Sequence, residues 1–305
     1  MDGRIFRNWS GNFHQVTKHY SIHMKPPLPS RTARFHAVLV TSFCALALGK
    51  ALFAVPTEPR TSESAVTPVE RSRHTDFLRE IKAANGDFDF VLIGDSITDW
   101  WPKRNGPDTY ACFAPWKPLD LGVAAETTEE VLWRLQNGEL DGIHPKVIML
   151  MIGTNNLGKG DKPEWVVAGI KKILETIRAK QPQAKILLLG IFPRAATAQD
   201  GIRKRIDEAN KLLPSLADGQ NIFYMDIGPK FLDVQGNLSK EVMPDLLHPN
   251  AKGYQIWIEA VGPKLQELMG SPLGPLGAPT APATSTFDVP TVSVKLTPLR
   301  SEPAK

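Results

Sequence analysis

The sequence predicts an α/β fold built on a parallel sheet. Short, solidly apolar runs, the pattern of strands buried on both faces, recur along the chain, and most are separated by helix patterns that are apolar on one side. Strands that alternate with helices form parallel sheets with helices on both faces. The expected strands cover residues 88–93, 119–123, 146–152, 184–190 and 221–227.

The first three expected helices are indicated either by apolar residues on one side or by residues typical of a helix end. Phe77, Leu78 and Ile81 share one side of the first. Acidic residues begin the second, and an Asn-Gly pair closes it. Pro163 opens the third, where proline is tolerated. We expect helices over residues 69–84, 126–136, 163–180, 198–213 and 250–269, and a loop rich in Trp and Pro over residues 99–118.

The positive charge of the chain is concentrated at its front. The 305 residues carry a formal charge of +4, but residues 1–54 hold seven Lys/Arg and one Asp, so the remainder is slightly acidic. The rest of the chain therefore offers no basic surface for nucleic acid, and we expect no nucleic-acid partner. The two cysteines, Cys44 and Cys112, cannot supply a disulfide framework.

The front segment has the layout of a secretory signal. Residues 37–48 form an apolar run of signal-peptide length, too short for a comfortable membrane span, and Arg31 and Arg34 precede it. Small residues follow, with cleavage expected after Ala51 or Ala54. We therefore expect an exported protein, whether periplasmic, envelope-associated or secreted, with no stable membrane span after processing. An uncleaved anchor is the alternative.

Four segments follow from these patterns. Residues 1–54 are the N-terminal extension and signal peptide, with Met24 as the expected true start, and residues 55–68 are a linker rich in Pro, Ser, Thr and Glu. Residues 69–269 form the α/β domain. Residues 270–305 are rich in Pro, Thr, Ser and Ala without a core pattern, so we expect a disordered tail.

The stretch over residues 88–101 contains a candidate nucleophile. Its apolar run meets Gly94, which allows a tight turn, and Ser96 follows where a helix would begin. Open α/β sheets hold their ligands at this carboxyl end of the strands, and N–H groups at a helix start favour an anionic intermediate. The alternative is that Ser96 only caps the helix.

A serine nucleophile needs a base and a group that orients the base. The histidines beyond the front segment are His74, which precedes the core, His144, which we expect to face solvent, and His248. Asp245 lies three residues before His248 in a loop bracketed by prolines. That spacing lets the carboxylate reach the imidazole and fix its tautomer, although it also fits an ordinary polar loop.

Two loops are candidates for the donors of an oxyanion hole. Residues 153–156, Gly-Thr-Asn-Asn, follow a buried strand, so the amide of Asn155 can point to the same place as Ser96. Residues 121–128 follow another strand and could supply a backbone N–H. Glycine and asparagine are also turn residues, so the first pattern fits a plain turn equally well.

Four motifs at strand ends therefore occur in a fixed order. They are G-D-S at 94–96, the loop at 122–125, G-T-N at 153–155 and D-x-x-H at 245–248. Together they resemble the SGNH (GDSL-type) hydrolase superfamily over residues 75–268. The segment 131–140 and the Pro-Lys-Val-Ile run at 145–148 are similar to the catalytic subunits of intracellular platelet-activating factor acetylhydrolase and their bacterial esterase relatives.

The resemblance implies a fold and a set of roles. The fold is a flavodoxin-like three-layer α/β sandwich with a central parallel sheet. Ser96 would be the nucleophile, His248 the base and Asp245 the group that orients it. The oxyanion hole would consist of the N–H of Ser96, the N–H of Ala125 and the side chain of Asn155.

The second motif departs from the family pattern at two positions. Ala125 stands where the family usually has glycine, and Asp120 stands where it usually has asparagine. An alanine N–H can serve as a donor if φ is negative. If φ must be positive, the alanine costs about 1 kcal/mol or more and the hole is distorted.

Aromatic residues follow the nucleophile closely. We expect Asp95, Trp100, Trp101 and Phe192 to line a substrate pocket, because sugar rings stack on indoles; the alternative is that most of these aromatics pack in the core.

We therefore expect an exported serine esterase without a cofactor or a catalytic metal. Its substrates would be small-molecule or carbohydrate esters with a short acyl group, chiefly acetyl, including O-acetylated carbohydrates. A thioesterase or lysophospholipase of the same fold is one alternative, and a non-catalytic binding module of the cell envelope is another. The sequence does not indicate the oligomeric state.

Overall fold

The structure, a computed structural model, describes residues 63–68 and 71–276. The expected signal peptide over residues 1–54, the start of the linker and the tail beyond residue 276 lie outside the described residues.

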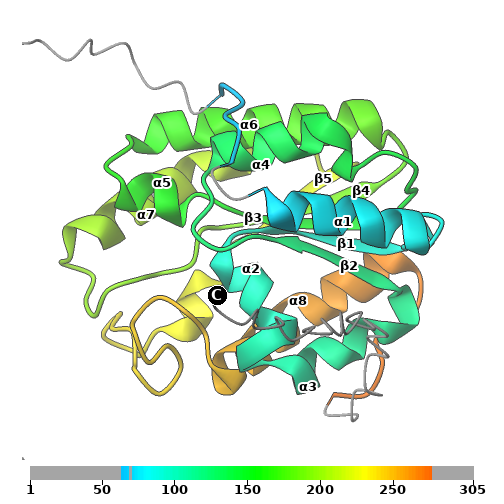
Figure 1. Ribbon diagram of the computed structural model, residues 1–305. Helices are drawn as coiled ribbons and strands as arrows, with labels where there is room; N and C mark the ends of the chain where they lie inside the picture. The colour runs from blue at the N-terminus through cyan, green and yellow to red at the C-terminus, as the bar shows by residue number, and fades with distance from the viewer. Residues whose placement is uncertain (1–62, 69–70, 277–305) are drawn as a thin grey trace, which may run out of the picture. The chain divides into compact units, whose positions relative to one another are not determined.

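In the described part of the chain, five parallel strands form one sheet in the order β2-β1-β3-β4-β5 (Figure 1). The chain moves from β1 to β2 on one side and returns to β3 on the other, so the strand order reverses between β1 and β3. Such a reversal leaves a ligand crevice at the carboxyl ends of the strands. The strands are Phe90–Gly94 (β1), Pro118–Gly122 (β2), Val147–Met151 (β3), Lys185–Leu189 (β4) and Ile222–Met225 (β5).

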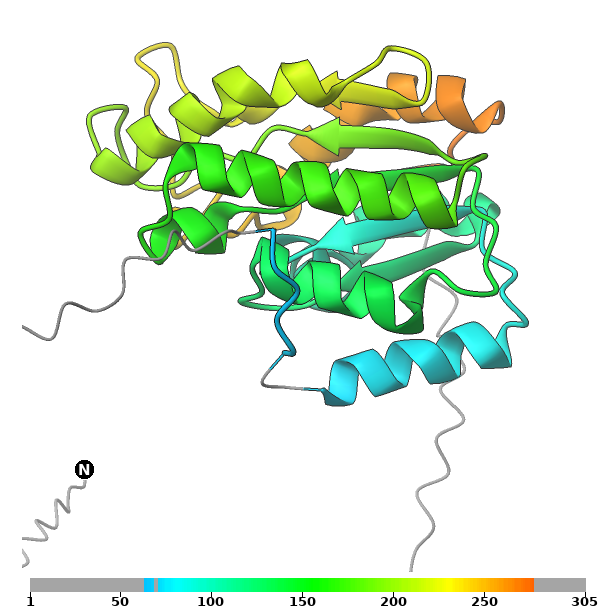
Figure 2. The same ribbon diagram turned by 90° about the horizontal axis from the view of Figure 1, so that it is seen from above.

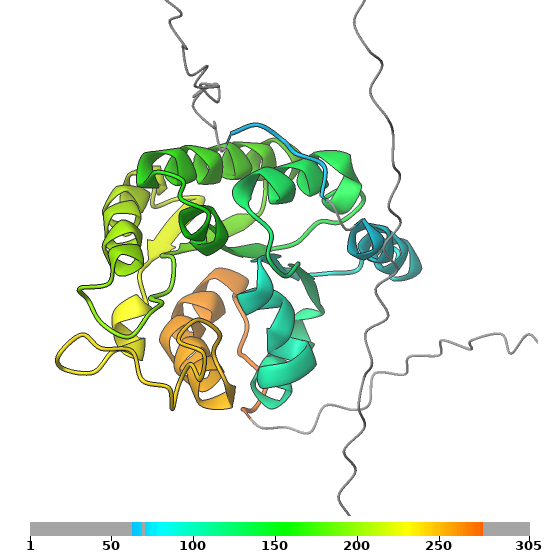
Figure 3. The ribbon, with the colours of Figure 1, turned by 60° about the vertical axis from the view of Figure 1, so that its left-hand side comes forward.

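Helices cover both faces of this sheet, which confirms the expected three-layer α/β fold. Four of them lie on one face and are seen from above in Figure 2: α1 (Ser72–Ala83), α4 (Thr128–Arg134), α6 (Pro163–Lys180) and α7 (Gly201–Leu212). The long helix α8 (Ala251–Met269) covers the other face together with residues 96–116 (Figure 3). The short helix α5 (Thr154–Gly158) follows β3 directly.

Residues 96–116 differ from the expected loop. They form a chain of short helical turns: α2 (Ser96–Trp100), η1 (Trp101–Asn105), α3 (Pro107–Tyr110) and η2 (Ala111–Trp116). Trp101, Phe113 and Trp116 are buried there against the sheet. Burial of these aromatic rings stabilises turns that are too short to give a helical period in the sequence.

The core consists of two halves, one on each side of the sheet. Along β1, Val91 and Ile93 point to the half under α1, α4, α6 and α7, while Phe90 and Leu92 point to the half under α8. All five residues of β1 are buried, because alternate side chains enter opposite layers. This explains why the strand reads as an unbroken apolar run.

Ordered contacts extend past both expected ends of the domain. The N–H of Val66 donates to the carbonyl of Glu129 (3.0 Å), so the linker already meets α4. After α8, the indole of Trp116 donates to Ser271 (3.0 Å), and the N–H of Gly274 donates to the carbonyl of Cys112 (2.8 Å). Among the residues placed in the structure, none of the helices has the length and apolarity needed to span a membrane.

Candidate active site

Ser96 is held at a sharp turn between β1 and α2. Asp95 caps the helix, because its Oδ1 accepts the N–H of Ile97 (3.0 Å), and Ser96 is the first helical residue. The turn requires glycine at position 94: a Cβ there would lie 2.1 Å from Thr98 Oγ1 and 2.7 Å from the Met151 carbonyl oxygen. As the first residue of α2, Ser96 has an N–H that no intrahelical carbonyl can satisfy.

The structure brings the serine, the histidine and the aspartate into one line. Ser96 Oγ lies 2.9 Å from His248 Nε2, and His248 Nδ1 lies 2.6 Å from Asp245 Oδ2. The carboxylate also requires the Nδ1–H tautomer, which leaves Nε2 free to accept the serine proton. This arrangement can activate a hydroxyl as a nucleophile.

The carboxylate of Asp245 is fixed by its own loop. Its Oδ1 accepts the N–H groups of Leu247 (3.1 Å) and His248 (2.8 Å). Partial burial acts to raise the pKa of Asp245, but the hydrogen bonds and charge of His248 outweigh it, so the pKa lies below its ordinary value. The aspartate is therefore ionised at neutral pH and holds the imidazole in orientation.

Trp100 covers the imidazole. Its ring centroid lies 4.1 Å from that of His248 with the planes 32° apart, and Arg104 lies over the indole, with Cζ 4.7 Å from the ring centroid. Trp100 is half-buried. The indole thus forms a wall that restricts the rotation of His248.

The loop after β2 and the start of α5, which carry the expected oxyanion donors, are joined by a hydrogen bond. Asn155 donates through Nδ2 to the carbonyl of Glu126 (2.8 Å), and its second Nδ2 hydrogen remains for a ligand. Ala125 is exposed and has φ +65°, in the left-handed region. Of the two backbone conformations weighed from the sequence, Ala125 therefore adopts the strained one with positive φ. The N–H of Ala125 has no partner among the described residues.

Comparison with known proteins agrees with this geometry. The profile of the GDSL-like Lipase/Acylhydrolase family matches residues 92–256. The chain belongs to this GDSL-like family. Platelet-activating factor acetylhydrolase IB subunit alpha1 of Bos taurus is 35% identical over 215 residues, which are 68% of this chain and 87% of the relative. Subunit alpha2 of Rattus norvegicus is 37% identical over 184 residues, 60% of this chain and 77% of the relative.

The solved structures show the likeness of fold. A GDSL-like lipase from Bacteroides thetaiotaomicron superposes with a TM-score of 0.56 at 18% identity, over 65% of this chain and 99% of that one. Family membership and the acetylhydrolase relatives together identify this GDSL-like protein as a carboxylic ester hydrolase.

A buried ionic network supports the loop that carries Ala125. Arg134, 1% exposed, donates through Nε to Glu126 Oε2 (2.7 Å) and through Nη2 to the Leu121 carbonyl (3.0 Å), so it holds both ends of the loop. It also pairs with Glu139, which lies 2.8 Å from His74 Nδ1. Burial raises the pKa of Glu126 to about 7, although Arg134 acts to lower it.

None of this network was expected from the sequence. His74 is not ahead of the core but buried within it, at 8% exposure, and no motif assigned a role to Arg134 or Glu139. A signal did exist for Arg134: it lies three residues after Val131, on the apolar side of its helix. Asn156 was missed too; buried completely, it accepts the N–H of Thr128 (3.0 Å) and thereby links α5 to α4. His144 is exposed, as expected.

Three of the four residues expected in a substrate pocket lie elsewhere. Trp101, 0% exposed, packs against Trp257 with centroids 4.4 Å apart, and Phe192, 1% exposed, packs against the same indole at 4.7 Å. Asp95 is also fully buried, as the cap of α2. These side chains therefore belong to the core and to the turn before α2, and they do not line an open pocket. Of the three aromatic residues among the four, Trp100 is the one whose ring packs on the catalytic histidine.

Three carboxyl groups near the site, those of Asp95, Asp120 and Glu126, have a buried oxygen without a hydrogen-bond partner. Asp120 Oδ1 accepts the N–H of Gly122 (2.9 Å), but its Oδ2 is buried without a hydrogen bond, as is Oδ2 of Asp95. Burial raises the pKa of each carboxyl to about 7. The carboxyl of Asp120 therefore binds a proton more readily than an ordinary aspartate does.

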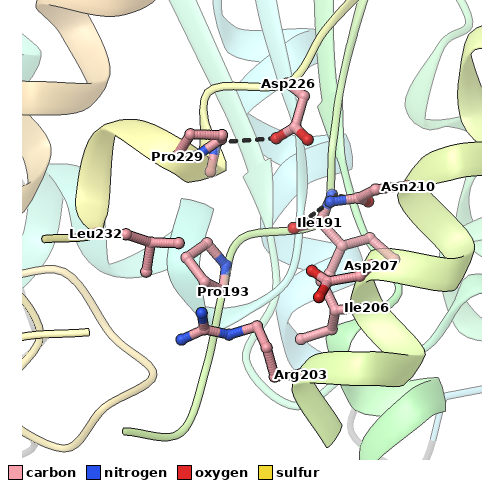
Figure 4. Close-up of a pocket in the computed structure, with 10 residues that line it drawn as sticks. Ile191, Pro193, Arg203, Ile206, Asp207, Asn210, Asp226, Pro229 and Leu232 are labelled. Atoms are coloured by element: carbon pink, nitrogen blue, oxygen red, sulfur yellow. Dashed lines mark hydrogen bonds between the residues drawn. The ribbon is translucent and has the colours of Figure 1, made fainter. Parts of the chain in front are cut away.

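The carboxyl ends of β4 and β5 hold a separate cavity of about 70 Å³ (Figure 4). It is lined by side chains such as Asp207, Asn210 and Asp226, and Asp226 Oδ1 accepts the N–H of Gly228 (2.9 Å). No triad residue lines it. Within the described residues, no group of three or more His, Cys, Asp or Glu side chains is placed to hold a metal ion.

Proposed function

We propose that this GDSL-like hydrolase is a serine esterase that removes short acyl groups, chiefly acetyl, from small-molecule and carbohydrate esters. The observation that carries the proposal is the line from Ser96 through His248 to Asp245, with contacts of 2.9 and 2.6 Å. The acyl preference is supported by the acetylhydrolase names of relatives at 35% and 37% identity.

The reaction proceeds by acyl transfer to the serine. His248 Nε2 takes the hydroxyl proton of Ser96 as Oγ attacks the ester carbonyl, while Asp245 stabilises the imidazolium that forms. The N–H groups of Ser96 and Ala125 and the Asn155 amide bind the oxyanion of the tetrahedral intermediate. The imidazolium then protonates the leaving alcohol, and water attacks the acyl-enzyme in the same way to release the acid.

Turnover of p-nitrophenyl esters of increasing acyl length tests the proposal. We expect hydrolysis of the acetate, a decline with longer chains, and no effect of chelators. Preference for long acyl chains or for thioesters would favour a lysophospholipase or a thioesterase instead. Loss of activity with EDTA and recovery with Zn²⁺ would overturn the mechanism.

We propose in addition that the protein acts after export, and the support is the apolar run over residues 37–48 with its preceding arginines. These residues lie outside the described part of the structure. N-terminal sequencing of the mature protein tests this proposal: we expect a start just after Ala51 or Ala54, and a full-length cytosolic product would contradict it.

A further inference from the structure

Arg194 lies at the edge of the candidate active site, and none of the steps above uses it. Its Nη1 lies 3.4 Å from the carbonyl oxygen of Thr154 and 3.5 Å from Thr154 Oγ1, at the start of α5. The next residue, Ala195, donates its N–H to the carbonyl of Leu246 (2.9 Å), within the loop that carries Asp245 and His248. The arginine therefore lies between the end of β3 and the catalytic histidine loop.

Two carboxylates of the candidate active site act on the charge of Arg194. Burial acts to lower the pKa of Arg194, and Asp95 and Asp245 act against it through their charges. Asp95 directly precedes the nucleophile, and Asp245 belongs to the triad. Arg205 adds a like charge, and the pKa of Arg194 remains below its ordinary value. Arg194 therefore lies within electrostatic range of the catalytic centre.

Arg194 has no carboxylate partner within ion-pair distance in the described part of the chain. Its side chain is half-buried, and taking a cation out of water without a counter-ion is costly. A guanidinium has five N–H donors, and among the described residues only Nη1 has hydrogen-bond partners, the carbonyl and the hydroxyl of Thr154, both at long distance. The remaining donors form the fork that binds a carboxylate or phosphate with two parallel hydrogen bonds.

A second arginine fixes the backbone from which this side chain extends. Arg203, 2% exposed, donates to the carbonyls of Arg194 (3.3 Å), Ala195 (3.0 Å) and Gly236 (3.2 Å). Figure 4 shows its guanidinium beside Pro193, the residue before Arg194. Because this loop is held by a buried side chain, less of the binding free energy is spent on ordering it.

We propose that Arg194 binds an anionic group, a carboxylate or a phosphate, on the alcohol portion of the ester substrate. The inference rests on the proposed function, because an acetyl group carries no charge and the anion must then belong to the alcohol. Arg194 is a specificity-determining residue in this account. It selects anionic esters and takes no part in the proton transfers between Ser96 and His248.

Three acetate esters of similar shape test the proposal with the full chain. They are 4-acetoxybenzoate, 4-acetoxyphenyl phosphate and the neutral 4-acetoxybenzamide. We expect kcat/KM of the wild type to favour at least one anionic ester over the benzamide by about tenfold, as a charge-assisted hydrogen bond provides. Arg194→Gln should reduce this ratio to near one. Lys159→Gln, which removes an exposed cation next to α5, should leave the ratio unchanged. The anion with the larger ratio identifies the group.

An equal rate on all three esters in the wild type would overturn the proposal, and so would a preference that survives in Arg194→Gln. Binding separates this failure from failure of the proposed function. In a Ser96→Ala background, calorimetry should give a Kd for the preferred anionic ester about tenfold lower with Arg194 than with the glutamine. If no ester is hydrolysed but the Kd values still differ in this way, the esterase proposal fails and the anion site stands. If the Kd with Arg194 equals the Kd with glutamine, the anion site fails.

Discussion

Replacing Ala125 with glycine should relieve strain that can be measured against a neighbouring control. Ala125 has φ +65°, whereas Ala124 is not in the left-handed region, and both are exposed. A side chain in that region costs ~1–2 kcal/mol. Glycine also raises the entropy of the unfolded chain, at a cost of ~0.4–1 kcal/mol. We therefore expect Ala125→Gly to gain up to ~1.5 kcal/mol and Ala124→Gly to lose ~0.4–1 kcal/mol.

The difference between the two variants isolates the strain, because the change in the unfolded chain is the same in both. The free energy of unfolding from urea titrations should differ by ~1–2 kcal/mol between them. Ala195→Gly, at φ +66° in another loop, should gain by a similar amount. Equal losses for Ala125→Gly and Ala124→Gly would show that position 125 is not strained, and the reasoning would be refuted.

Activity gives an independent reading of the same variant. The donor at position 125 is a backbone N–H, which glycine also has. The kcat of Ala125→Gly should therefore fall far less than the ~10²-fold that loss of an oxyanion donor costs. A loss of that size would mean that the side chain of Ala125, and not its N–H alone, shapes the hole.

Three further predictions concern the surroundings of the triad. Asp120→Asn should raise the free energy of unfolding by ~1–3 kcal/mol at pH 8 and little at pH 4. The reason is that the carboxyl of Asp120 has a pKa of about 7 in the folded protein, so the wild type loses stability as the pH rises from the ordinary carboxyl pKa to about 7. An equal gain at both pH values would contradict this. Asp245→Asn should lower kcat by ~10²–10⁴, because the imidazole loses its orienting charge, and an unaffected variant would remove Asp245 from the triad. Trp100→Ala should lower kcat about threefold to tenfold by freeing His248, whereas Trp100→Phe should retain most activity; equal losses would exclude a stacking role.

The sequence predicted those parts of the site that short motifs encode. The turn before Ser96 and the pair Asp245–His248 each lie within a few residues of chain, so their local geometry follows from spacing. Parallel strands then bring their carboxyl ends to one edge, but the meeting of Ser96 and His248 there was expected from the resemblance of the four motifs to a known family. The 2.9 Å contact between them joins residues 152 positions apart.

Features that depend on where a side chain points were not predictable in the same way. Trp100 and Trp101 are neighbours, but successive helical residues point in directions about 100° apart, so one covers His248 and the other enters the core. Residues 99–116 have no periodicity that would distinguish them. Arg134 and His74 meet through Glu139, and no spacing rule connects positions 74 and 139.

The central claim is that Ser96 carries out the hydrolysis, and it is tested most directly by acetate release from p-nitrophenyl acetate with wild type and Ser96→Ala. The alanine variant should unfold at the same urea concentration as the wild type, lose at least ~10³-fold in kcat, and no longer be labelled by a fluorophosphonate. A folded Ser96→Ala variant that keeps most of the wild-type turnover would contradict the account.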